Sequence, residues 1–109
     1  MIGTIGKPLD EDLYRRVVEG FDHKLVDSVD GLKDCKVHYF HPNADEKEYN
    51  LLLSFSLDIP VVSLGNAWFP TFNPAQYIEN GKTGYYSNNV DEVRWAIKRL
   101  LENGAKNEG

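Results

Sequence analysis

The sequence predicts one α/β domain, in which helices pack on a mostly parallel sheet of about five strands. Short apolar segments alternate along the chain with segments whose apolar residues follow the period of a helix. Residues 59–64 form a continuous apolar run with two adjacent valines, which is typical of a strand buried on both faces of a parallel sheet. The length of 109 residues is enough for one domain and too short for two.

Local patterns place the strands and the first helix. A helix is expected to begin at Asp10, because apolar residues follow it at the spacing of one helical face. Gly20 stands where this helix should end, and Asp30 with Gly31 marks a turn. The expected strands are residues 2–5, 24–29, 36–40, 59–64 and 85–86.

Three later helices are predicted from one repeated capping pattern. Each begins with an asparagine that stands three residues before a glutamate or glutamine, namely Asn43, Asn73 and Asn89. Gly81 and Gly104 are the expected ends of the second and third of these helices. The domain is therefore expected to comprise residues 1–104, followed by a frayed tail over residues 105–109.

The composition excludes several classes of protein. A hydrophobic fraction of 41% and a charged fraction of 27% are ordinary for a globular domain. The net charge of −5 disfavours nucleic acid as a partner, because an acidic surface repels a polyanion. Cys35 is the only cysteine, so an intrachain disulfide is impossible and a reducing compartment fits. No signal-peptide pattern and no apolar stretch of membrane length is visible, so we expect a cytoplasmic protein without a membrane span.

Candidate binding residues follow from the rule that ligands of open parallel sheets bind outside the carboxyl ends of the strands. Phosphates favour helix N-termini, and only the helix expected from Asn73 opens without a carboxylate. Ala75 and Gln76 in its first turn therefore join Asn73 as candidate phosphate contacts. Lys7 follows the first strand and could reach a pyrophosphate as a point charge, although the glycine spacing before it is that of neither a P-loop nor Gly-x-Gly-x-x-Gly. The alternative for Lys7 is an exposed lysine in a turn.

The aromatic loop, residues 64–72, is the most unusual segment. Trp68 could stack on a sugar or a base, with Asn66 supplying hydrogen bonds. The alternatives are a hydrophobic lid over a small core or a dimer contact. His38 and His41 would point to opposite faces of a strand, and no carboxylate or cysteine stands at ligand spacing, so we expect no metal site. No catalytic signature occurs, and the catalytic residues stay unassigned.

Two longer segments resemble a known family. They are the Pro-Val-Val strand at residues 59–63 and the run Tyr-Ile-Glu-Asn-Gly-Lys-Thr-Gly-Tyr at residues 77–85, which is followed by a helix that begins Asp-Glu. Together, over residues 59–103, they resemble the C-terminal, donor-binding domain of glycosyltransferases with the GT-B fold, of the group 1 or family 4 type, in a shortened form. The resemblance implies a Rossmann-like domain and a nucleotide-diphosphate-sugar as the donor substrate, with no other cofactor.

The resemblance also implies roles for individual residues. The donor phosphates would lie over Gly65, Asn66 and residues 73–76, in agreement with the carboxylate-free helix start. The family's first-strand glycine and basic residue would correspond to Gly3 and Lys7. Its base-contacting backbone would correspond to Phe40, His41 and Pro42.

The chain also departs from the family pattern. The family carries two glutamates eight residues apart, and in one register the corresponding residues are Asp45 and Leu53, which leaves the ribose-binding acid missing. In a second register, residues 56–60 match the preceding strand of the family; either way about one strand–helix unit and the acceptor-binding domain are absent.

Three functions therefore stay open. The first is a donor-binding domain that transfers a sugar only with a separate acceptor-binding subunit or as a homodimer. The second is a non-catalytic domain that binds a nucleotide or a sugar. The third is a structural or assembly protein that uses the aromatic loop as an interface.

Overall fold

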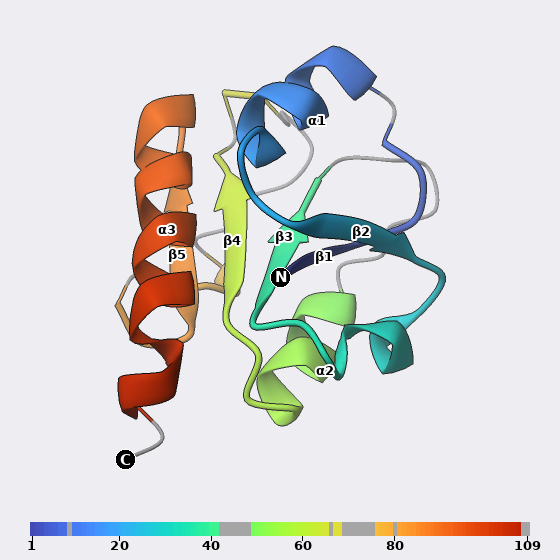
Figure 1. Ribbon diagram of the computed structural model, residues 1–109, viewed down its shortest axis with the longest axis vertical. Helices are drawn as coiled ribbons and strands as arrows, with labels where there is room; N and C mark the ends of the chain where they lie inside the picture. The colour runs from blue at the N-terminus through green and yellow to red at the C-terminus, as the bar shows by residue number, and fades with distance from the viewer. Residues whose placement is uncertain (9, 42–48, 66, 69–75, 80, 108–109) are drawn as a thin grey trace.

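The computed structural model shows a three-layer α/β domain, and it describes all residues except 9, 42–48, 66, 69–75, 80 and 108–109 (Figure 1). The strands are β1 (Ile2–Ile5), β2 (His23–Val26), β3 (Val37–Phe40), β4 (Val61–Leu64) and β5 (Gly84–Ser87). The helices are α1 (Glu11–Val18), the 3-10 helix η1 (Val29–Leu32), α2 (Tyr49–Ser56) and α3 (Val90–Asn107). The predicted fold class is confirmed.

All neighbouring strands in the described sheet are parallel, in the order β2-β1-β3-β4-β5. The chain adds β2 on one side of β1 and then crosses to the other side for β3, so the direction of winding reverses between β1 and β3. This order is that of a Rossmann-like sheet, 3-2-1-4-5-6, without its outermost strand on one side, and it is also the flavodoxin-like order. The reversal creates a topological switch point at the carboxyl ends of β1 and β3.

The helices cover both faces of the sheet because neighbouring residues of a strand point to opposite faces. On β3, the ring of Tyr39 lies 6.2 Å from the ring of Tyr14 in α1, whereas His38 bonds to Ser54 in α2. Helix α3 packs beside α1, and α2 packs beside η1. The buried apolar residues form a large core and a smaller cluster around Leu32.

Local caps explain where α1 and α3 begin. The side chain of Asp10 accepts a hydrogen bond of 3.0 Å from the amide of Leu13, as the expected helix start requires. The side chain of Asn89 accepts hydrogen bonds from the amides of Asp91 and Glu92, at 2.8 and 3.3 Å. The sequence predicted a helix start at Asp10 and a cap at Asn89, and both are confirmed.

One tie between these helices was not foreseen. The guanidinium of Arg94 in α3 donates to the carbonyl oxygens of Arg16 and Val17, at 3.0 Å each, and its carbon lies 5.0 Å from the ring centroid of Phe21. The last turn of a helix leaves carbonyl groups without intrahelical partners, and Arg94 satisfies two of them at the end of α1.

Three predictions about the elements are wrong by more than the shifts of one or two residues seen at other strand ends. Strand β2 ends at Val26, not at residue 29, because Val29 already begins the 3-10 helix that contains the expected turn. Helix α3 continues to Asn107 past Gly104, since a glycine within a helix costs only about 1 kcal/mol relative to alanine. Residues 105–107 of the expected tail are therefore helical.

The third error concerns the helix expected from Asn73 to Gly81. Gln76 lies in a 3-10 turn, Tyr77 in a turn, and Ile78 and Glu79 in irregular backbone, so no α-helix runs through residues 76–79. The expected starts of this helix, at Asn73, and of the earlier one, at Asn43, lie outside the described residues.

The glycines of residues 77–85 have structural explanations. Gly81 has a φ of +84°, which L side chains rarely adopt, and it sits in the turn before β5. Gly84 lies against β4 so closely that a Cβ there would overlap the carbonyl oxygen of Val61 and stand 2.9 Å from its amide nitrogen. Gly84 thus allows β5 to lie close to β4.

We predict that Gly84→Ala destabilises the domain by about 3 kcal/mol or more, because backbone atoms of β4 cannot move aside without breaking the sheet. Gly81→Ala is the matched control, since its Cβ would meet nothing within 4 Å and only the backbone strain of about 1 kcal/mol applies. Urea unfolding of both variants measures the difference. Equal losses would show that the close approach to Val61 does not matter.

Candidate functional site

The switch point between β1 and β3 is the geometric site at which open parallel sheets bind ligands. Residues 6–8 leave β1 there and lead to α1, while His41 follows β3. Farther along the same edge, Asp27 follows β2 and Gly65 follows β4. These residues are therefore the first to examine for binding chemistry.

A groove of about 530 Å³ runs from this edge along β2, between α1, β2 and the β1–α1 connection, and reaches His23 at the amino end of β2. This volume lies within the range of small-molecule sites, about 300–1,000 Å³. Two cations, Lys7 and Arg15, and two carboxylates, Glu11 and Asp27, line it. Its remaining lining residues are Gly6, Pro8, Tyr14, His23, Leu25 and Val26.

Lys7 is an exposed cation of this groove. Within the described part of the chain, no carboxylate lies at ion-pairing distance from its ammonium group. Arg15, in contrast, stands 3.9 Å from Glu11 one helical turn away, an exposed pair of little energetic weight. Lys7 is thus placed to take a ligand anion.

A buried histidine fixes the connection that carries Lys7. His41 Nε2 lies 3.2 Å from the carbonyl oxygen of Asp10, and His41 Nδ1 lies 2.8 Å from the hydroxyl of Tyr39. Because a carbonyl only accepts, Nε2 carries the proton and donates to Asp10, and the tyrosine hydroxyl donates to Nδ1. The end of β3 is thereby bound to the N-cap of α1 across the switch point.

The histidine works in its neutral form. Both Tyr39 and His41 are 0% exposed. Burial lowers the pKa of His41 from 6.5 to about 4, and it raises the pKa of Tyr39 well above 10. His41 therefore positions the β1–α1 connection and does not project into the crevice.

The other predicted residues in the first half of the chain are part of the packing. Gly3 is buried in β1, and a Cβ there would overlap Leu32 and stand 2.8 Å from Cys35 Sγ. Phe40 is 5% exposed within the large core. The structure thus explains Gly3 and Phe40 without a ligand.

In the second half, Asn88 organises the loop after β4. Its side-chain oxygen Oδ1 accepts a hydrogen bond of 3.1 Å from the backbone amide of Ala67. Its backbone carbonyl oxygen accepts one of 2.7 Å from the indole nitrogen of Trp68. A Cβ on Gly65 would overlap its side chain. Trp68 is therefore anchored on the β5–α3 connection, and 40% of its surface remains exposed.

The predicted site residues Pro42, Asn66 and 73–75, which include Asn73 and Ala75, lie outside the described residues. Gln76 is exposed, and the structure gives it no contact with Lys7 or Trp68. The structure thus places Lys7, His41, Gly65 and Trp68 along one edge of the sheet, in the order of strands β1, β3 and β4.

Asp27 is a residue that sequence reasoning missed. It directly follows β2 and lines the groove with Lys7. In dinucleotide-binding domains, an acid about 20 residues after the glycines of the first strand binds the ribose hydroxyls. Asp27 stands at that separation from Gly6 and could have been found from it.

Two other polar groups are structural. His38 Nδ1 and Ser54 Oγ lie 2.7 Å apart, but both side chains are 0% exposed, so no substrate reaches them. Among the described residues, no group of three or more histidine, cysteine or acidic side chains is placed to hold a metal ion.

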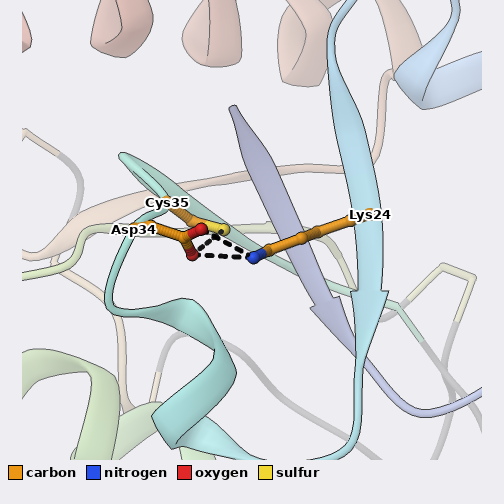
Figure 2. A network of polar contacts seen from close by, with 3 residues as sticks. All are labelled: Lys24, Asp34 and Cys35. Carbon is orange, nitrogen blue, oxygen red and sulfur yellow. Dashed lines mark hydrogen bonds and ion pairs between the residues drawn. The ribbon is translucent and has the colours of Figure 1, made fainter.

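Cys35 belongs to a surface network with Lys24 and Asp34 (Figure 2). The ammonium of Lys24 donates to both carboxylate oxygens of Asp34, at 2.7 and 2.9 Å. The sulfur of Cys35 lies 3.8 Å from one of these oxygens. Burial raises the pKa of the Cys35 thiol; the Lys24 ammonium opposes this shift and the Asp34 carboxylate adds to it, so the net effect favours the protonated thiol.

Comparisons of the chain with protein-family models, curated proteins and solved structures find no match. The likeness to glycosyltransferases therefore depends on the residues of this chain alone. Within the described residues, none of the helices has both the length and the apolar character needed to cross a bilayer.

We predict that His41 makes the stability of the domain depend on pH. Its pKa is about 4 in the folded chain and 6.5 when unperturbed, so between these values the unfolded chain holds a proton that the folded chain lacks. Stability is fully present above pH 6.5 and falls as the pH is lowered toward 4, by about 3 kcal/mol in total.

Urea unfolding between these two pH values measures the effect. His41→Gln should flatten the dependence, because an amide keeps a donor and an acceptor but does not titrate. His23→Gln is the control, since His23 is an exposed histidine near the same groove, and it should leave the dependence unchanged. An unchanged pH dependence in His41→Gln would contradict the assignment.

Proposed function

We propose that the chain is a donor-binding domain of the glycosyltransferase type, which binds a nucleotide-diphosphate-sugar along the carboxyl edge of its sheet. The observation that carries the proposal is the position of Lys7, an exposed cation without an ion pair in the described structure, beside the switch point and in a groove of ligand size. A diphosphate is the part of such a donor that most needs a fixed positive charge.

The resemblance over residues 59–103 supports the proposal at the level of the fold. These residues include β4 and β5, the two strands beyond β3 on that side of the switch point, and most of α3. The backbone conformation at Gly81 and the close approach of β4 at Gly84 already require glycine at these positions. The run at residues 77–85 therefore gives little information about the ligand. The chemical argument therefore depends on Lys7 and its neighbours.

We now assign the diphosphate to Lys7 and not to the helix start at residue 73. That earlier hypothesis needed a helix long enough to present aligned amide groups and a dipole. The described backbone after Gln76 is not helical, which removes the support for a long helix there. A point charge at the end of β1 needs no such helix.

The order of residues along the edge suggests how the donor lies. Asp27 follows β2, Lys7 follows β1, and Trp68 lies beyond β4. With strands about 4.8 Å apart, β1 and β4 are separated by roughly 10 Å. The ribose would contact Asp27, the diphosphate Lys7, and the sugar the exposed ring of Trp68. This arrangement places the base near β2, in contrast to the base contacts that the family implies for residues 40–42.

We assign binding to this chain and leave the transfer step to a second partner. GT-B enzymes react a donor on one domain with an acceptor on another, so an acceptor-binding subunit or a second copy would complete the site. A cytoplasmic location agrees with a nucleotide-sugar ligand. Failure to bind any nucleotide-sugar would leave the alternative of an assembly protein that uses the aromatic loop as its interface.

We predict that Lys7→Ala weakens binding of UDP-, GDP- or ADP-glucose by about tenfold or more, because a hydrogen-bonded charge pair is lost. Lys98→Ala removes the same charge from the outer surface of α3 and should leave the affinity unchanged. Isothermal titration calorimetry with each donor measures both effects. Equal weakening by the two variants would mean that only net charge matters.

A further substitution separates the two phosphate positions. Gln76→Glu adds a negative charge at the earlier candidate position and should leave the affinity unchanged if the diphosphate lies at Lys7. Loss of binding in Gln76→Glu, together with full binding by Lys7→Ala, would return the diphosphate to the segment around residue 76.

A further inference from the structure

One side of α3 carries an acid, an aromatic ring and a base in a row. We call Glu92, Trp95 and Arg99 the α3 stripe; their spacing of three and four residues places them on one side of the helix. The guanidinium carbon of Arg99 lies 5.3 Å from the centroid of the Trp95 ring, and 56% of the surface of Trp95 is exposed. The exposed indole ring thus lies between an acid and a base on one side of the helix.

The α3 stripe follows the outermost strand of the sheet. Glu92 accepts a hydrogen bond of 2.5 Å from Ser87, the last residue of β5. Trp95 shares a hollow of about 300 Å³ with Tyr85 and Tyr86, and Arg99 lines a second hollow that also contains Tyr85. Figure 1 shows α3 lying over β5 at one side of the molecule. In the described sheet, β5 has a neighbour only on its β4 side.

We propose that this surface binds a second copy of the chain, turned by 180° about an axis beside Trp95. Glu92 and Arg99 are two helical turns apart, with Trp95 between them. A copy turned about that axis places Glu92 of each chain opposite Arg99 of the other, and the two indole rings meet at the centre. The surface is therefore complementary to itself, as a two-fold interface requires.

The same two-fold axis would also bring the β5 strands of the two copies together. Glu92 contacts the carboxyl end of β5, and Arg99 lies toward its amino end, so the middle of the α3 stripe is level with the middle of β5. Two copies of β5 would then run antiparallel beside each other. In other proteins, edge strands placed in this way extend one sheet through both partners.

Charge and size favour a second copy over an unrelated partner. The chain carries a net charge of −5, which opposes self-association in general, but the α3 stripe has one charge of each sign. The molecule measures 38 × 27 × 27 Å, and its long side is large enough for the ~800 Å² that each partner buries in a stable interface. A peptide that added a strand to β5 alone would give no role to the opposite charges of Glu92 and Arg99.

Charge reversal tests this arrangement directly. Sedimentation velocity at concentrations up to about 100 µM should show a dimer of the unmodified chain. Glu92→Arg places two arginines opposite each other at both contacts, and Arg99→Glu places two glutamates there, so each variant alone should be monomeric. An equimolar mixture of the two variants restores an acid–base pair at both contacts and should form a heterodimer.

Controls keep the result specific. Lys33→Glu reverses a charge on an exposed lysine of another element and should leave the dimer unchanged. Trp95→Ala should weaken association by about tenfold or more, as expected of a central aromatic contact. Circular dichroism and thermal unfolding verify that each variant folds.

Three results would overturn the proposal. The first is a monomeric unmodified chain over the whole concentration range. The second is a dimer that persists in both Glu92→Arg and Arg99→Glu, because the interface would then lie elsewhere. The third is a mixture of folded variants that does not associate. None of these results depends on nucleotide-sugar binding.

Discussion

The hydrogen bond from His41 to the carbonyl oxygen of Asp10 is the contact on which the geometry of the switch point depends. At a switch point, the connections from neighbouring strands lead to helices on opposite faces, so few side chains bridge the gap. In this protein a neutral, buried imidazole bridges it, held from the other side by Tyr39. The bond fixes both the start of α1 and the short connection that carries Lys7. A binding groove at this edge can be preformed only if this connection is held still.

The residues that resemble a known family and the residues that carry binding chemistry lie in different halves of the chain. The glycines of residues 77–85 permit a tight turn and a close approach of two strands. Gly65 likewise makes room for Asn88. In contrast, Lys7 belongs to no recognisable motif and Asp27 is marked only by its separation from Gly6, yet both line the groove between α1 and β2. The glycines of residues 77–85 thus serve the packing of the sheet, whereas single residues at the ends of strands line the candidate site.

Much of the fold could be predicted from the sequence because its signals are local. The caps at Asp10 and Asn89 lie within three residues of the amides that they bind. The continuous apolar run before Gly65 identifies a buried strand for the same reason. The end of α3 was missed because a single glycine is a weak stop signal. The helix after Asn73 was overestimated because a capping box signals where a helix starts and not how far it continues.

The candidate site was harder to predict because its contacts join distant parts of the chain. The partners of His41 and Trp68 are 31 and 20 residues away, and no pattern in the sequence reveals them. The histidine was expected to offer its backbone to a base, but its ring is used to join two elements. Asp27 could have been found, because its position after the second strand and its distance from Gly6 are both readable.

The contacts of Arg94 have a consequence for how the chain reaches its native state. This residue satisfies carbonyl groups at the end of α1 that lie 77 and 78 residues earlier in the sequence. During synthesis the first helix therefore emerges long before the residue that completes it. Contacts of such long sequence separation slow folding, since a large loop must close before they form. The end of α1 accordingly lacks these two hydrogen bonds until Arg94 has been synthesised and has reached it.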